Sequence, residues 1–134
     1  MNRDDVQGAI AAAQYFLELY PYAYNTGDLT EWREMSHPEC IFCASVIENV
    51  EALHASGGYQ FGGEIEWLSI EGDESASTGL VAVDAVARQG PTFESRKNVT
   101  DEVSSGGRAR LFVDLELEEG WLVRGVDVEN IGAQ

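Results

Sequence analysis

Residues 36–58 read SHPECIFCASVIENVEALHASGG and separate two halves of the chain that differ in pattern. The stretch begins with Ser36–Glu39, which supplies a cap residue, a proline for the first turn and an acid near the helix amino terminus. It continues through Cys40 and Cys43 into a helix body, which Gly57–Gly58 end as a C-terminal stop. Helical periodicity precedes the stretch and strand-like alternation follows it, so we expect this helix to join a helical layer to a sheet.

A long amphipathic helix is expected before this stretch. Its apolar residues recur at alternating spacings of four and three, which places them on one helix face; they are Val6, Ile10, Ala13, Leu17, Tyr20 and Tyr24. A proline inside a helix removes one hydrogen bond and clashes with the preceding turn. Pro21 therefore predicts a kink or an early end near Leu19.

Two shorter helices are expected to follow. The turn at residues 25–28 ends in Asp28, whose capping-box spacing with Glu31 predicts a short helix through Met35. The helix that starts at Ser36–Glu39 is expected to turn an apolar face inward. The residues of that face are Cys43, Ile47, Val50 and either Leu53 or His54.

After Gly58 the apolar period changes from 3.6 to 2, as in a sheet. The first strand runs from Tyr59 to Ile70, is interrupted at Gly62–Gly63 and changes parity after Trp67, which indicates a bulge or a strong bend. The strand-like residues thus begin directly after the glycine stop, and we expect the sheet to curve at this bend.

Three more strands complete the expected sheet. The segment from about Thr78 to Arg88 is mostly apolar on both faces, which predicts a central strand. Residues 108–117 show the clearest alternation in the chain, with Phe112 as the one exception. A tight turn at Glu119–Gly120 then predicts a hairpin partner from Trp121 to about Val128.

The segment between the second and third of these strands, residues 89–107, is polar and rich in turn residues. Its apolar residues are too sparse to specify a buried element; they are Phe93, Val99 and Val103. We therefore expect extended strand ends that lead into a long mobile connection.

Composition limits the classes of protein that fit. A length of 134 residues and a hydrophobic share of 44% predict one globular domain, residues 1–134, with its own core. The formal net charge of −16 argues against binding to nucleic acid or to anionic lipid headgroups, because like charges repel. No run of apolar residues approaches the length of a membrane span.

The order of elements resembles a known superfamily. Three helices precede a curved antiparallel sheet, and the tyrosine-rich first helix runs into Asn25-Thr26-Gly27-Asp28. These features resemble the nuclear transport factor 2-like (SnoaL-like, cystatin-like) superfamily. The resemblance implies an α+β fold, a cone in which N-terminal helices pack on the concave side of a curved antiparallel β-sheet.

A finer resemblance is carried by the first half of the chain. The aromatic helix Tyr15–Tyr24, the turn at residues 26–28, the segment HPECIFC at residues 37–43 and the glycine-rich residues 57–62 resemble a family of actinobacterial lipoproteins of unknown function. This resemblance implies a mature domain held on the extracytoplasmic face of the membrane through a lipidated cysteine ahead of Met1. It also implies an oxidising compartment, and it brings no established activity.

Cys40 and Cys43 have the C-x-x-C spacing of a thioredoxin-type pair at a helix amino terminus, where the helix dipole lowers the pKa of a thiol. A thioredoxin motif follows a strand, however, whereas this pair follows a loop between helices. The favoured interpretation is a structural disulfide. No metal site is expected, because four ligands are needed and only His37 and His54 remain to complete one.

Five residues are candidates for ligand binding. Arg124, on the Leu122–Val126 side of the last strand, and Asp84, on a similarly apolar side of the second, would anchor a ligand if they paired inside a cavity. If that face is exposed they form an ordinary surface contact, which is the favoured interpretation. The aromatic candidates for lining a pocket are Trp32, Tyr59 and Trp67, and core packing explains them equally well.

The leading hypothesis is a non-catalytic, cell-envelope lipoprotein domain that binds a protein partner or a small ligand through the concave sheet or the long connection. The alternative is a small SnoaL-like enzyme, an isomerase, cyclase or hydrolase, with acid–base residues such as Asp84 or His37 in the cone. A thiol–disulfide redox protein is the third hypothesis. No catalytic residue and no cofactor are assigned, and the sequence leaves open whether two cones pair through their sheets.

Overall fold

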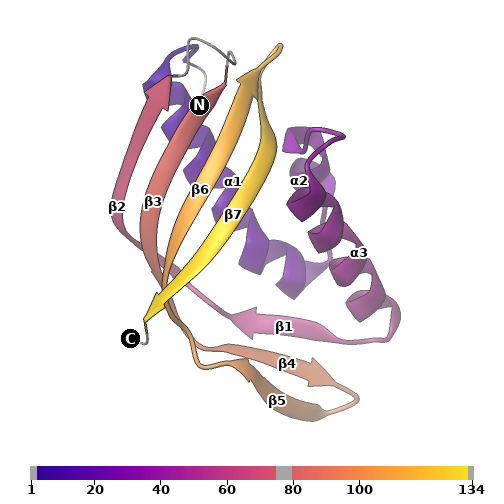
Figure 1. Cartoon of the computed structure of the whole chain (residues 1–134). Helices are drawn as coiled ribbons and strands as arrows, with labels where there is room; N and C mark the ends of the chain where they lie inside the picture. Colours follow the sequence, from indigo (N-terminus) through magenta and orange to yellow (C-terminus); the bar gives the residue numbers. More distant parts are fainter. Residues whose placement is uncertain (1–2, 75–79, 133–134) are drawn as a thin grey trace.

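The computed structural model describes residues 3–74 and 80–132. Within these residues, three helices come first and seven strands follow, in two antiparallel sheets (Figure 1). The helices are α1 (Val6–Thr26), α2 (Thr30–Met35) and α3 (Ile41–Ala55). The strands are β1 (Tyr59–Gly62), β2 (Ile65–Glu74), β3 (Val81–Gln89), β4 (Thr92–Arg96), β5 (Val99–Ser104), β6 (Gly107–Leu117) and β7 (Trp121–Gly132). This order confirms the expected α+β class.

Helix α1 is longer than Pro21 predicted. Asp5 caps its start by accepting a hydrogen bond from the Gly8 N–H. The helix ends at Thr26, and its C-cap Gly27 has a φ of 79° and donates its N–H to the Ala23 carbonyl. Of the two alternatives predicted from Pro21, a kink or an early end, the early end near Leu19 is wrong, because the helix continues to Thr26. Leu17 and Ala23 are buried on either side of the proline, and we infer that this packing outweighs the missing hydrogen bond.

The larger sheet has the strand order β2-β3-β6-β7 and curves around α1 (Figure 1). The expected central position of β3 is confirmed, since it pairs with β2 on one side and β6 on the other. The expected bulge is confirmed as a register shift between Trp67 and Ser69. The predicted second strand began near Thr78, which lies outside the described residues, and β7 continues past Val128 to Gly132.

The core forms where α1 crosses the concave face of this sheet. The alanines Ala9, Ala12 and Ala13 are fully buried there. Gly72 of β2 allows a close approach, because a Cβ added at Gly72 would lie 2.7 Å from Cγ1 of Val6. Small side chains on both elements therefore bring the first half of α1 against the sheet.

Helix α3 starts later than its sequence predicted. The expected start at Ser36–Glu39 is wrong, because α3 begins at Ile41 with Cys40 as its N-cap. Ser36 instead forms a β-bridge with Val123, and the His37 N–H donates to the Val123 carbonyl at 2.9 Å. Pairing with β7 thus competes with helix formation in this segment. The buried residues of α3 are Cys43, Val46, Val50 and Leu53.

The expected mobile connection at residues 89–107 is wrong. The segment folds into the β4–β5 hairpin, which joins β1 in a three-stranded sheet of order β1-β4-β5 (Figure 1). Lys97 and Asn98 form its two-residue turn, and both have positive φ values, of 52° and 68°, as a type I′ turn requires. The pattern of apolar residues missed the hairpin because all of β5 is exposed.

No helix in the described part of the chain is long and apolar enough to span a membrane.

Candidate ligand-binding cavity

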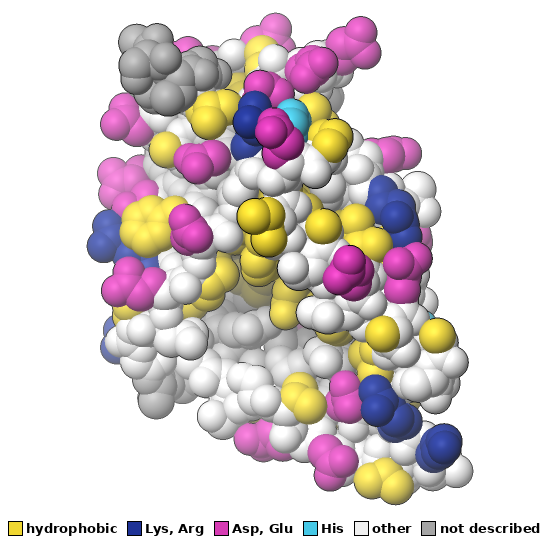
Figure 2. Space-filling model, turned by 45° about the vertical axis from the view of Figure 1, so that its right-hand side comes forward, with side chains coloured by type: hydrophobic (Ala, Val, Ile, Leu, Met, Phe, Trp, Pro, Cys, Tyr) yellow, Lys and Arg dark blue, Asp and Glu magenta, His cyan; other side chains and the backbone are white. Residues whose placement is uncertain are grey.

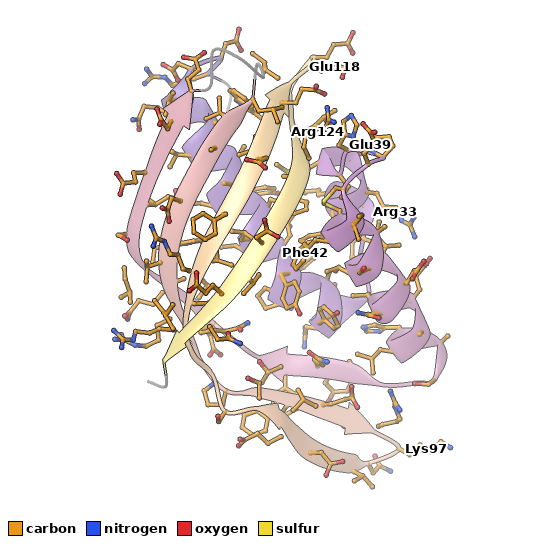
Figure 3. The ribbon with its side chains drawn as sticks, in the orientation of Figure 1. Arg33, Glu39, Phe42, Lys97, Glu118 and Arg124 are labelled. Carbon is orange, nitrogen blue, oxygen red and sulfur yellow. A yellow bond between two sulfur atoms is a disulfide. The ribbon has the colours of Figure 1, made fainter. Side chains whose placement is uncertain are left out.

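A cavity of about 160 Å³ lies between the helices and the concave face of the four-stranded sheet. Its lining residues come from α1, α3 and all four strands of that sheet; they are Leu17, Tyr20, Phe42, Ile65, Ala87, Gln89, Ala109, Leu111, Val128 and Asn130. Figure 3 shows Phe42 pointing from α3 into the space between the helices and the sheet. The surface is hollowed on the side where α3 faces the sheet (Figure 2). The cone therefore contains a space that its core does not fill.

The cavity exists because small side chains lie on this part of the concave face of the sheet. Ala87 of β3 and Ala109 of β6 are paired directly across the sheet, on the concave face. Four residue pairs further along, Val83 is paired with Val113, and both are buried in the core. The change from valine to alanine leaves the end of the concave face near Gln89 unfilled. Beside it Val128 is 50% exposed, so the cavity reaches solvent next to β7.

The polar groups of the cavity are neutral. Burial raises the pKa of the Tyr20 phenol, and the neighbouring Tyr24 adds to this effect, so Tyr20 stays protonated at neutral pH. Gln89 donates from Nε2 to the Gly63 carbonyl at 3.3 Å, and Asn130 lies at the exposed end of β7. The lining residues include no carboxylate, imidazole or cationic side chain. The cavity can offer hydrogen bonds, but it lacks a general base with a pKa near neutrality.

The three aromatic candidates do not meet at this cavity. Trp32 is 1% exposed, stacks on Phe16 with ring centroids 3.9 Å apart, and donates from Nε1 to the Cys43 carbonyl. Tyr59 is 42% exposed on β1, and Trp67 donates from Nε1 to Glu18 at 3.3 Å. The aromatic lining comes instead from Tyr20 and Phe42.

Asp84 and Arg124 do not pair with each other. Arg110 donates to both carboxylate oxygens of Asp84, at 3.0 and 2.7 Å, and its guanidinium also lies over the ring of Phe112. These hydrogen bonds lower the pKa of the Asp84 carboxyl. The group lies on the convex face, so the structure places Asp84 in a surface ion pair outside the cavity.

Arg124 belongs to a polar cluster that holds the α2–α3 loop against β7. Its guanidinium donates to Glu116 at 3.1 Å and to Glu39 at 3.0 Å (Figure 3). His37 accepts the Glu39 backbone N–H at Nδ1, and its Nε2 lies 3.6 Å from Glu116. Sequence patterns missed this cluster because it joins a loop to two strands far away in the chain.

Cys40 and Cys43 form a disulfide in the structure, and each is 1% exposed. The Cys40 sulfur also accepts the Cys43 N–H at 3.1 Å, which caps α3. A pair buried to this degree cannot be reached by a dithiol in the folded protein. Within residues 3–74 and 80–132, no three His, Cys, Asp or Glu side chains are arranged to hold a metal ion.

The helices and the curved sheet define an α+β fold that solved structures share. The chain is similar to the intermembrane space region of chloroplast protein ARC6, with 14% identity, a TM-score of 0.70 and coverage of 96% of this chain and 99% of that chain. A Catenulispora acidiphila protein has 16% identity, a TM-score of 0.58 and coverage of 92% and 93%. A Caulobacter vibrioides protein with a cystatin-like fold has 15% identity, a TM-score of 0.56 and coverage of 94% and 91%. At these identities the likeness shows the fold alone.

The sequence itself places the chain in a family. It belongs to DUF6318, a family of unknown function whose model matches residues 1–126. No curated protein matches the sequence. The family and the fold are therefore established, and the function has to be inferred from the site.

Reduction of the disulfide is expected to need opening of the fold. Treatment with a dithiol in native buffer, followed by alkylation and mass measurement, should label Cys40 and Cys43 slowly, at a rate that follows unfolding. Loss of a four-residue loop constraint should lower the free energy of unfolding by about 2 kcal/mol in urea titrations. Rapid reduction with unchanged stability would instead support the thiol–disulfide redox hypothesis.

The free energy of unfolding should depend on pH through the Asp84 carboxyl. A carboxyl whose folded pKa is lowered stabilises the fold above its unfolded pKa of about 3.9, and this contribution is lost as pH falls through the folded pKa. Asp84→Asn should therefore lower the midpoint of thermal unfolding at pH 7. As the pH falls, the midpoints of the variant and the unmodified protein should converge. Asp127→Asn removes an exposed carboxylate of the same face and provides the control; an equal effect of both would contradict the role of the Arg110 pair.

Proposed function

We propose that the protein is a non-catalytic binding domain whose cone cavity takes a small, largely apolar ligand with a neutral hydrogen-bonding end. The observation that carries this proposal is an open apolar cavity whose polar groups are Tyr20, Gln89 and Asn130. Such concave, mostly apolar sites with a few polar groups are typical of ligand pockets.

The volume sets the size of the ligand. An apolar cavity of about 150 Å³ holds a benzene molecule, and the cone cavity has a similar size. One aromatic ring or a short alkyl chain fits between Leu17 and Leu111. Because the cavity reaches solvent at Val128, a longer ligand can extend outward along β7. The net charge of −16 disfavours the approach of anionic molecules.

Acid–base catalysis has less support. A SnoaL-like isomerase, cyclase or hydrolase would need a carboxylate or an imidazole within reach of a substrate in the cone. Asp84 is paired with Arg110 on the convex face, and His37 lies beside Glu116 in the loop cluster. Tyr20 has a raised pKa, which suits a hydrogen-bond donor rather than a base at neutral pH.

The proposal includes a location in the cell envelope, where a lipid anchor would hold the domain at the extracytoplasmic face of the membrane. Its supports are the resemblance of residues 15–62 to lipoproteins and the buried disulfide, since disulfides persist in oxidising compartments. Fractionation of cells that express the full-length gene should recover the protein with membranes, released by detergent and with Cys40 and Cys43 oxidised. Recovery in the cytosol with free thiols would contradict this location.

Filling the cavity should weaken ligand binding. Indole is a suitable neutral probe, and its binding can be followed by shifts of backbone amide signals in NMR titrations. Ala109→Phe places a ring in the cavity and should weaken indole binding at least tenfold. Ala82→Phe makes the same change on the convex face, where Ala82 is exposed, and should leave binding unchanged.

The two variants also locate the site. Indole shifts in the unmodified protein should be largest around β6 and β7, and the spectrum of Ala109→Phe should show a folded protein. Unchanged indole affinity in Ala109→Phe, or shifts confined to the convex face, would contradict the cavity as the binding site.

A further inference from the structure

The smaller sheet has an open edge. All six residues of β5 are exposed, and two of them are apolar, Val99 at 59% and Val103 at 49% exposure. The opposite edge is different, because Asn25 of α1 donates from Nδ2 to the Gln60 carbonyl of β1 at 3.1 Å. Within the described residues, β5 is thus the strand of this sheet that no other element covers (Figure 1).

The register of the hairpin shows which backbone groups are available. The turn at Lys97–Asn98 pairs Arg96 with Val99, and in a two-residue hairpin this closing pair is hydrogen-bonded. Pairs alternate along antiparallel strands, so the N–H groups of Thr100 and Glu102 point away from β4. A further strand can use these groups and the carbonyls beside them.

The charges on the β5 edge favour a cationic partner. Asp101 and Glu102 lie at the centre of β5 and point to opposite faces of the sheet. Val99 lies on the face of Asp101, and Val103 lies in the bulge between the Phe93–Glu102 and Thr92–Ser104 pairs. On the other face, Glu102 lies opposite Phe93, whose ring stacks on Phe61 with centroids 5.3 Å apart. A cationic side chain placed there would meet a carboxylate and aromatic rings together.

We propose that the edge of β5 docks an extended basic segment of another protein, which adds to the sheet as a fourth strand. Main-chain hydrogen bonds would supply affinity, and alternate side chains would supply selectivity. In an antiparallel arrangement the segment carries an apolar residue opposite Val103, two consecutive Lys or Arg residues opposite Glu102 and Asp101, and an apolar residue opposite Val99.

A second copy of the chain does not fit this edge. Aligning two β5 edges antiparallel would bring Asp101 and Glu102 of one copy against the same acids of the other, and each copy carries a net charge of −16. Like charges directly opposite in a sheet are destabilising. The proposed segment has the opposite charge at the same positions.

The test uses a fluorescein-labelled peptide that contains Val-Lys-Arg-Thr-Val, with Val-Glu-Glu-Thr-Val as the reference peptide. Anisotropy titrations should show binding of the basic peptide, at least tenfold tighter than the acidic one and weaker in high salt. Amide signals of Thr100 and Glu102 should shift most in NMR spectra. Absence of binding, or shifts centred elsewhere, would overturn the proposal.

Two double variants distinguish binding at the β5 edge from electrostatic attraction by the net charge of the whole protein. Asp101→Lys with Glu102→Lys should weaken peptide binding at least tenfold. Glu118→Lys with Glu119→Lys changes net charge equally at the exposed β6–β7 turn and should change affinity less than twofold. Equal losses in both would mean that total charge alone attracts the peptide.

Thr100→Pro tests the backbone contacts. It removes one outward N–H and keeps both acids, so affinity should fall at least fivefold while amide signals outside the hairpin stay unchanged. Full affinity in this variant would overturn strand addition. A concentration-dependent dimer with shifts at β5, observed without peptide, would assign the edge to a second copy. The β5 site is separate from the cavity, so loss of peptide binding leaves the indole result intact.

Discussion

The fold depends on the burial of one face of α1 in the concave side of the four-stranded sheet. Ala9, Ala12 and Ala13 are fully buried, and Gly72 leaves room for Val6 and Ile10, so the first half of the helix lies close against the strands. Further along, Leu17 and Tyr20 are larger and face Ala87 and Ala109 across the cavity. The same contact therefore closes the core at one end and leaves a cavity at the other.

The disulfide and the loop cluster complete this arrangement. Cys40 and Cys43 flank Phe42, which lines the cavity, and Ile41, which is 83% exposed. The His37 N–H bond to Val123 fixes the start of the loop on β7, and the disulfide fixes the first turn of α3. We infer that the C-x-x-C spacing serves to aim one aromatic ring at the sheet. This role needs a stable bond, whereas redox cycling needs an accessible one.

Sequence patterns predicted the elements that one-sided burial dictates. The spacing of Val6 to Tyr24 identified α1, and the alternation of residues 109–117 identified β6, because each has one buried face. They failed at Ser36, where pairing with the distant strand β7 determines the local structure. They also failed in β5, where no residue is buried and the sequence carries no burial pattern. The residues that line the cavity were missed for a related reason, since alanines that leave space carry no distinctive signal. Trp32 was a candidate for a pocket, yet its ring and indole N–H are satisfied within the core.

The distribution of charge separates the two inferred sites by the molecules that can reach them. Of the charged side chains, 24 are acidic and 8 are basic, and none lines the cavity. A neutral ligand gains from apolar burial there and pays nothing for desolvation of a protein charge. At β5 the carboxylates remain in water, so they contribute mainly to attraction and selection of a basic segment, while backbone bonds provide its fixed register. A neutral interior beneath an acidic surface thus favours one kind of ligand inside the cone and another kind of partner at its edge.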